Sequence, residues 1–295
     1  MKRRSLLKSA AAAGVLGVPA ILRGMLVRDD SYLDTIGLQL WTVRNQMESD
    51  PSRTLKAVAE AGYRQVELMN VLASRDIVAQ ARELGMQVTS AFVDWQSIGN
   101  PEADGAPRFD DILELAQALK LKHLVFGYIG RGHRESVQQF QKHAERANAA
   151  GEKCRKAGIQ LCYHNHSFEF QPLQNERAGF DVLVDEFEPA LVKFELDVFW
   201  AQLGGRNPLD IIRQLSGRIS QLHLKDLLAG TAINYDEGAV PNDAFQELGD
   251  GVIDMAEVLN AGRKAGVSQC HVEQDQSPAP LESIVQSLQH LKSLN

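Results

Sequence analysis

The sequence predicts an α/β fold, a single (β/α)8 TIM barrel in which eight parallel strands alternate with eight helices. Short apolar runs alternate with segments whose apolar residues recur at helical spacing, and this unit repeats eight times after residue 31. Such a barrel takes roughly 250 residues, which the chain of 295 residues supplies as one domain over 31–295. A doubly wound open sheet is the runner-up, but no Gly-x-Gly-x-x-Gly motif follows a strand to support it.

Four strand–helix units are predicted in the first half of the chain. Strands are expected over 35–41, 64–69, 86–93 and 123–128, and helices over 50–61, 73–84, 107–119 and 136–157. Asp50 and Pro51 give the first helix a capping acid and a proline in its first turn. Gly62 and Gly85 end the first two helices, since glycine commonly follows the last helical turn.

Four more units follow in the second half. Strands are expected over 161–164, 192–197, 219–224 and 268–273, with helices around 180–187, from 207, after 254 and from 281. The segment between Asp226 and Asp254 is longer than most connections between a strand and a helix. We therefore expect it to form a lid or a substrate-binding loop.

Residues 1–30 lie outside this repeat and predict a twin-arginine export signal with a short linker. Arg3 and Arg4 precede a short apolar region over 9–22, and a small-residue cleavage site follows at Ala20. A basic amphipathic helix or a membrane anchor is the alternative, but the apolar region is short for a span and contains Gly and Pro. We expect a periplasmic or extracytoplasmic protein with no stable membrane span after cleavage.

The charge balance argues against nucleic acid as a partner. The formal net charge is -7, and removal of Lys2, Arg3, Arg4 and Lys8 with the signal would make it more negative by four. A protein that binds a phosphate backbone needs a basic surface instead. The three cysteines are an odd number and imply no disulfide framework, while a homo-oligomer remains possible because one sequence leaves no readable trace of its interface.

Side chains that bind metals follow four of the predicted strands. Asp197, His223 and Glu273 end the sixth, seventh and eighth strands, where barrels of this class assemble their active sites. Carboxylate and imidazole ligands suit a divalent cation such as Mn2+, Co2+, Zn2+ or Mg2+ better than Ca2+. The alternative is that each is a separate residue at the barrel mouth, held by a salt bridge or a loop amide.

The fifth strand offers three candidates, His164, His166 and Glu169. We predict Glu169 as the fourth metal ligand beside Asp197, His223 and Glu273, because a second acid balances the charge of the ion. His164 and His166 then bind substrate hydroxyl groups or transfer protons, together with the carboxylates of Glu169 and Glu273. The alternative for His166 is a structural imidazole that orients a ligand.

Further candidates lie around the same predicted mouth. Lys225 either stabilises an enolate oxygen as a catalytic residue or pairs with Asp226, which we expect at the mouth as a substrate contact. Glu67 points either into the barrel or toward its mouth. Trp41 and Trp200 suit the apolar face of a sugar ring, although aromatic residues near strand ends more often serve ordinary packing.

Five segments together resemble the xylose-isomerase-like barrel superfamily of sugar isomerases and epimerases. They are Tyr-His-Asn-His-Ser-Phe-Glu-Phe at 163–170, Leu-Asp-Val-Phe-Trp at 196–200, Gln-Leu-His-Leu-Lys-Asp at 221–226, the Leu-Gly-Asp-Gly motif from 248 to 254 and His-Val-Glu-Gln-Asp at 271–275. The resemblance covers the chain from about residue 35. It implies a divalent ion held at Asp197, His223, Glu273 and an acid of the fifth strand. His164 stands where ketose epimerases carry a ligand glutamate, a departure that moves the carboxylate role to Glu169.

The predicted function is a divalent-metal-dependent keto-sugar isomerase or epimerase that removes a proton next to a carbonyl group polarised by the metal. The His-Asn-His variant behind an export signal is also similar to lyases that cleave 3-keto-glycosides, so a lyase or dehydratase is the close alternative. A periplasmic sugar-binding protein without turnover is the alternative of another class. A phosphodiesterase acting on damaged DNA would need a richer metal cluster and a basic face.

Overall fold

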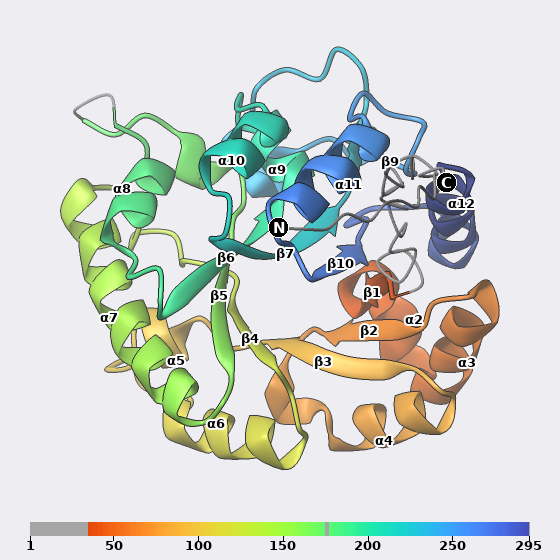
Figure 1. The fold of residues 1–295 in the computed structure, drawn as a ribbon, viewed down its shortest axis with the longest axis horizontal. Coiled ribbons are helices and arrows are strands. Elements are labelled where there is room, and N and C mark those ends of the chain that lie inside the picture. Colours follow the sequence, from red (N-terminus) through yellow and green to blue (C-terminus); the bar gives the residue numbers. More distant parts are fainter. Residues whose placement is uncertain (1–34, 175–176, 295) are drawn as a thin grey trace, which may run out of the picture. The chain divides into compact units, whose positions relative to one another are not determined.

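The computed structural model describes residues 35–174 and 177–294, and the predicted export signal over 1–30 lies outside them. The barrel belongs to a compact unit over Ser31–Asn295. Its strands form the centre and its long helices surround them (Figure 1). Within the described part of the chain, none of the helices combines the length and apolar character needed to cross a membrane.

Eight parallel strands close into a barrel, which confirms the predicted fold class. Around the barrel the order is β1-β10-β7-β6-β5-β4-β3-β2. The strands are β1 (Gly37–Gln39), β2 (Gln65–Leu68), β3 (Gln87–Phe92), β4 (His123–Phe126), β5 (Gln160–His164), β6 (Val192–Asp197), β7 (Ile219–Leu224) and β10 (Gln269–Val272).

One longer helix follows each barrel strand, as the sequence predicts. These helices are α3 (Pro51–Ala61), α4 (Arg75–Glu83), α6 (Phe109–Ala118), α7 (Val137–Lys156), α8 (Gly179–Glu186), α10 (Pro208–Gln214), α11 (Met255–Lys264) and α12 (Pro280–Ser293). Asp50 caps α3 as expected, because its carboxylate accepts a hydrogen bond from the backbone N–H of Arg53 at 3.0 Å. Gly62 ends α3 with a φ of 109°, a left-handed conformation that favours glycine.

Three short helices that the sequence analysis does not predict follow strand ends. They are α2 (Arg44–Ser49), α5 (Gln96–Gly99) and α9 (Val198–Leu203), and each is too short to show a helical period in the sequence. The short helix α9 matters most for the site. It begins directly after Asp197, whose carboxylate caps it.

The long segment after β7 contains a small antiparallel pair of its own. The strands β8 (Asp226–Leu227) and β9 (Phe245–Gln246) pair with each other, and two 3-10 turns, η4 (Glu237–Ala239) and η5 (Asn242–Ala244), lie between them. A further 3-10 turn, η3 (Phe168–Phe170), follows β5.

The strand register brings the chemically active side chains to one level of the barrel. Asp197 pairs with His223 across β6 and β7, and His223 pairs with His271 across β7 and β10. Glu195 pairs with His164 of β5 in regular register, and an irregularity between Phe194 and Glu195 shifts the pairing of β6 with β7 so that Glu195 also lies beside Gln221. Carboxylates and imidazoles from distant parts of the sequence therefore meet inside the barrel near the carboxyl ends of its strands.

Candidate active site

Four side chains meet at the carboxyl ends of the strands, and we call them the mouth group. His164, Asp197, His223 and Glu273 each offer one ligand atom, and these atoms all lie within 4.8 Å of one another. All four side chains are buried. Three of them, Asp197, His223 and Glu273, are residues that the sequence analysis predicts as metal ligands, and the structure brings them together.

Asp197 is fixed by contacts that leave one carboxylate oxygen available. Its backbone N–H donates to Oδ1 of Asn165 at 3.1 Å, and its carbonyl oxygen accepts from Nδ2 of Asn165 at 3.3 Å. Its Oδ1 accepts from the backbone N–H of Trp200 at 2.8 Å, while Oδ2 accepts no hydrogen bond from the residues that the structure describes. Burial raises the pKa of Asp197 to about 6, although Lys225 and His223 lower it in part.

Lys225 is the buried cation beside the mouth group. Its Nζ lies 3.1 Å from Oδ2 of Asp197, 2.8 Å from Oε2 of Glu273 and 2.7 Å from Oδ2 of Asp275. Burial opposes its charge, but the three carboxylates raise the pKa of Lys225 and keep it an ammonium ion. Burial likewise opposes ionisation of Glu273, but Lys225 and His223 lower the pKa of Glu273 to about 2.

The imidazoles on the fifth-strand side are neutral. Burial lowers the pKa of His164 well below its ordinary value and that of His166 to about 3. Both rings line the pocket described below, and their centroids are 5.0 Å apart. They can therefore accept a proton, bind a metal or hydrogen-bond a hydroxyl group.

A pocket of about 230 Å³ opens onto this arrangement. Its wall combines apolar and aromatic side chains with a few polar ones, as is typical of small-molecule sites. The lining residues are Gln39, Trp41, Met69, Phe92, Gly127, Tyr128, His164, His166, Lys225, Glu273 and Asp275. Trp41, which the sequence analysis proposes as a sugar contact, is 45% exposed and lies at this wall.

The segment over 226–254, predicted as a lid or binding loop, reaches the pocket wall. Glu237 accepts a hydrogen bond from the hydroxyl group of Tyr128 at 2.8 Å and from Nη2 of Arg134 at 2.7 Å. Because Tyr128 lines the pocket, this segment borders the space that a substrate would occupy.

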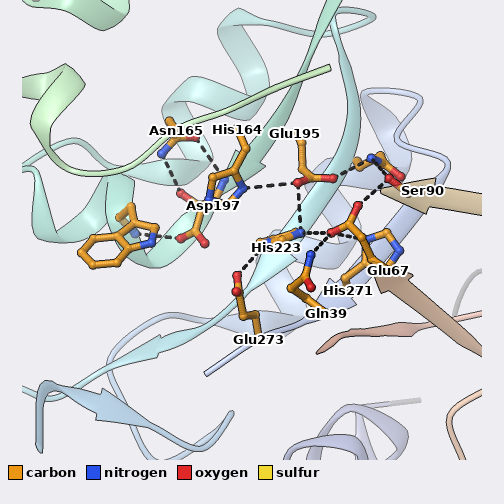
Figure 2. Close-up of polar contacts among 12 residues, drawn as sticks. Gln39, Glu67, Ser90, His164, Asn165, Glu195, Asp197, His223, His271 and Glu273 are labelled. Atoms are coloured by element: carbon orange, nitrogen blue, oxygen red, sulfur yellow. Dashed lines mark hydrogen bonds and ion pairs between the residues drawn. The ribbon is translucent and has the colours of Figure 1, made fainter. Parts of the chain in front are cut away.

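A second set of buried ligand-type side chains, the inner group, shares His223 with the mouth group. It consists of Glu67, Glu195, His223 and His271, whose ligand atoms also lie within 4.8 Å of one another. Nε2 of His223 is 2.6 Å from Oε2 of Glu67 and 3.0 Å from Oε1 of Glu195 (Figure 2). The sequence leaves two orientations open for Glu67, into the barrel or toward its mouth. In the structure its side chain points into the barrel interior.

Glu169, predicted as the fourth metal ligand, lies outside both groups. Its Oε1 accepts from the hydroxyl group of Tyr163 at 2.7 Å and its Oε2 from the backbone N–H of His166 at 2.9 Å. The turn η3 folds the buried carboxylate back onto these two donors. The structure therefore corrects the expected geometry, because His164 and not Glu169 meets Asp197, His223 and Glu273.

Two predicted substrate contacts are buried behind the pocket wall instead. Asp226 is 1% exposed, and its carboxylate accepts from the backbone N–H groups of Leu227, Gly249, Gly251 and Ile253. It fixes the loop after β7 and does not face the pocket. Trp200 is 2% exposed and packs against His166, with ring centroids 5.2 Å apart.

The sequence analysis missed several residues of the site. Asp275 lines the pocket and follows Glu273 by two positions, and Glu195 precedes Asp197 by two. A two-residue spacing on an extended segment puts side chains on the same face, so this signal was available. Gln39 and Tyr128 carry no comparable signal, because they are single polar residues at the ends of apolar runs.

The mouth group fits a divalent cation. Oδ2 of Asp197 is a buried atom without a hydrogen-bond partner among the described residues, and it faces Nζ of Lys225 at 3.1 Å. Two imidazoles and two carboxylates are a donor set that Zn2+, Mn2+ and Co2+ accept. The arrangement can also move a proton, because ionised Glu273 and neutral His166 both line the pocket.

The chain belongs to the xylose isomerase-like TIM barrel family, whose family model matches residues 55–294. Inosose dehydratase 1 from Bacillus cereus (strain ZK / E33L) is 30% identical to it over 128 residues, which cover 41% of this chain and 42% of the relative. The matched segment thus spans only about half of the length of the curated relatives.

Solved structures share the fold. A sugar phosphate isomerase/epimerase from Parabacteroides distasonis ATCC 8503 superposes with a TM-score of 0.71 at 22% identity, covering 88% of this chain and 93% of that one. The IolI protein, solved with a binding zinc atom, superposes with a TM-score of 0.64 at 14% identity, covering 88% and 96%. At these identities the likeness shows the fold alone.

Proposed function

We propose that this protein is a divalent-metal-dependent enzyme that removes a proton next to the carbonyl group of a small keto-sugar and then expels a β-substituent. Members of its family are enzymes, and the reaction would be that of a lyase or dehydratase. The observation that carries the proposal is the mouth group, four buried ligand-type side chains beside the pocket. His164, Asp197, His223 and Glu273 would hold the ion, and Mn2+, Co2+, Zn2+ or Mg2+ are the candidates.

A bound divalent ion supplies a Lewis acid that polarises the carbonyl group. Glu273 is placed to accept the carbon-bound proton, because it is a carboxylate that lines the pocket. Lys225, held 2.8 Å from Glu273, provides a fixed positive charge beside the oxygen on which negative charge develops. His166 and Asp275 line the same pocket and are positioned to hydrogen-bond substrate hydroxyl groups.

Elimination is favoured over isomerisation by the sequence relatives. Inosose dehydratases from several bacteria, whose name describes loss of water from a keto-polyol, match this chain at 26% to 30% identity. Isomerisation or epimerisation is the second candidate, and it starts with the same proton removal. It is supported by the presence of more than one proton acceptor in the pocket, since Glu273 and His166 could serve two positions of one substrate.

The test uses the purified protein with Co2+, Mn2+ or Zn2+ in D2O and a panel of an inosose, 3-keto-glucosides and free ketoses. Mass spectrometry should show loss of water or release of the aglycone, and NMR should show deuterium next to the carbonyl group. Deuterium uptake with no loss of a substituent would indicate the isomerase or epimerase instead. If no substrate reacts or exchanges with any metal, the proposed chemistry is wrong.

A non-catalytic sugar-binding protein is distinguished in the same experiment. It would be stabilised by a sugar in the presence of a chelator, without turnover. Metal-dependent stabilisation together with turnover would exclude it.

We also propose export by the twin-arginine route, on the basis of residues 1–30. Cell fractionation of the full chain should recover it outside the cytoplasm. Replacement of Arg3 and Arg4 by lysine should retain it in the cytoplasm. If both forms fractionate alike, export by this route is contradicted.

A further inference from the structure

We propose that Glu195 is a positioning residue that orients His164 as a metal ligand, with Glu67 doing the same for His223. This inference rests on the proposed metal site of the mouth group. It assigns the inner group a role in support of that site, and not as a second site.

A single oxygen of Glu195 lies between the two imidazoles. Oε1 of Glu195 is 3.3 Å from Nδ1 of His164 and 3.0 Å from Nε2 of His223. Figure 2 shows Glu195 with a dashed contact to each of the two rings. Within the described part of the chain, this oxygen and Nδ1 of His164 are buried atoms that lack a hydrogen bond, so each is available to the other.

Glu67 already contacts the second imidazole, that of His223. Oε2 of Glu67 lies 2.6 Å from Nε2 of His223, the closest contact of that nitrogen, and Nδ1 of the same ring lies 2.7 Å from Glu273 in the mouth group. If Nε2 donates its hydrogen to Glu67, loss of the proton on Nδ1 leaves a lone pair directed at the mouth. Glu195 is then left to serve His164.

The same reasoning fixes the tautomer of His164. When Nδ1 donates its hydrogen to Glu195, the lone pair of the ring lies on Nε2, which leaves that nitrogen to bind the ion; the ring itself lines the pocket. Metal-binding histidines generally donate their other ring N–H to a carboxylate or carbonyl group in this way. Glu195 and Glu67, on the interior side, thus orient the imidazoles of His164 and His223 as metal ligands.

A hydrogen-bond network holds both carboxylates in place. Oε2 of Glu195 accepts from Nε2 of Gln221 at 2.6 Å, and Gln221 also donates to Oγ of Ser90 at 3.1 Å. Ser90 in turn donates to Oε1 of Glu67 at 2.5 Å, and Gln39 donates to Oε2 of Glu67 at 2.8 Å. Strands β1, β3 and β7 therefore restrain the rotamers of the two glutamates that β2 and β6 supply.

The inner group is a poor site for an ion of its own. Three oxygens of its two carboxylates already accept hydrogen bonds from Gln39, Ser90 and Gln221. The group also does not border the pocket, because neither Glu67, Glu195 nor His271 lines it. An inner cation would have to share His223 with the mouth group.

The test measures Co2+ binding to the purified protein by chelator competition, together with the visible absorption spectrum of bound Co2+. The substitution Glu195→Gln should weaken Co2+ binding by about 10- to 100-fold and change the spectrum, the range known for residues that orient a ligand. The substitution Glu169→Gln, at another buried glutamate, should leave both unchanged. Thermal unfolding of the metal-free proteins shows whether each variant is folded.

A double-variant cycle tests whether Glu195 acts through His164. In a His164→Ala background, Glu195→Gln should cause a much smaller further loss of Co2+ affinity than in the wild type. An equally large loss in both backgrounds would overturn the role in orienting His164. Should Glu195→Gln fail to fold, Gln221→Met removes the anchor of the carboxylate without removing its charge, and unchanged Co2+ affinity in that variant overturns the inference.

The remaining outcomes separate this inference from the proposed function. If the wild type binds one Co2+ and Glu195→Gln binds it with the same affinity and spectrum, only the positioning role fails. If the wild type binds no Co2+, Mn2+ or Zn2+, both fail. If the wild type binds two ions and Glu195→Gln only one, Glu195 is a metal ligand and the positioning role is wrong.

Discussion

The mouth group and the inner group have similar side chains but different surroundings. Each contains two carboxylates and two imidazoles within 4.8 Å, and they share His223. The mouth group borders a pocket and faces the ammonium group of Lys225, whereas three oxygens of the inner carboxylates accept hydrogen bonds from Gln39, Ser90 and Gln221 and none of the inner side chains lines the pocket. Residue type alone therefore does not separate a reactive site from its support, and the surroundings of each group do.

The largest effect is expected from Asp197→Asn in the mouth group. The variant keeps an oxygen to cap α9 but loses the charge on Oδ2, so kcat/KM should fall more than the ~10- to 100-fold typical of residues that only orient a ligand. Steady-state kinetics with saturating Co2+ measure it. Asp226→Asn, a buried aspartate outside both groups, is the control and should retain bound Co2+. Full activity of Asp197→Asn would contradict the assignment of the mouth group as the reactive site and the inner group as its support.

Lys225→Met tests the buried cation that the mouth group has and the inner group lacks. Removal of an ammonium ion that faces Asp197, Glu273 and Asp275 leaves buried carboxylates unpaired, at a cost of about 3–5 kcal/mol in the free energy of unfolding at pH 7. Urea unfolding measures the loss.

The pH dependence of this loss has a defined sign. In the wild type Lys225 helps to hold the pKa of Glu273 near 2, below its unfolded value, so this stabilisation is present above about pH 4.5 and is lost as the pH falls toward 2. The difference between the wild type and Lys225→Met should shrink over the same range. A difference that does not change with pH would show that packing, and not charge, is responsible.

Glu169→Gln examines a buried carboxylate that belongs to neither group. Burial raises the pKa of Glu169 to about 8, so its ionisation favours the unfolded chain. Wild-type stability should therefore decline between about pH 4.5 and pH 8, by at most ~1.4 kcal/mol for each step of one in pH, and Glu169→Gln should not show this part of the decline. Unfolding at pH 5 and pH 9 measures it, and parallel curves for the two proteins would contradict a buried, protonated Glu169.

The smallest effect is expected from Trp41→Ala at the pocket wall. Loss of an aromatic surface for a sugar ring should raise KM by about 10-fold, or about 1.4 kcal/mol, with kcat and Co2+ affinity unchanged. Leu72→Ala is a matched control, because Leu72 is 43% exposed but does not line the pocket. Equal effects of the two substitutions would mean that Trp41 makes no specific contact.

The sequence predicted the fold because each of the eight barrel strands and each of the eight longer helices carries its own periodic signal, and the two kinds alternate. The strand ends also indicated Asp197, His223 and Glu273, since parallel strands present their carboxyl ends at one face. The fourth member could not be assigned this way. His164 and Glu169 are five residues apart, and only the fold of η3 shows that the glutamate turns back onto Tyr163.

The inner group illustrates a second limit of sequence reasoning. Glu195 and His271 lie within apolar strands, where their neighbours indicate core positions. The two-residue spacing from Asp197 indicates the face of Glu195 but not its partner. The partner follows from strand pairing, which places Glu195 beside His164 across β5 and β6 and His271 beside His223 across β7 and β10. The buried loop anchor Asp226 is similar, because its four backbone partners lie between one and 27 positions away.

The most direct test of the central claim is metal analysis of the purified protein after loading with Co2+ and removal of excess ion. The wild type and Glu169→Gln should each retain one ion per chain, and Asp197→Asn should retain none. Absence of bound metal in the wild type, or loss of the ion from Glu169→Gln with retention in Asp197→Asn, would contradict a metal site built from His164, Asp197, His223 and Glu273.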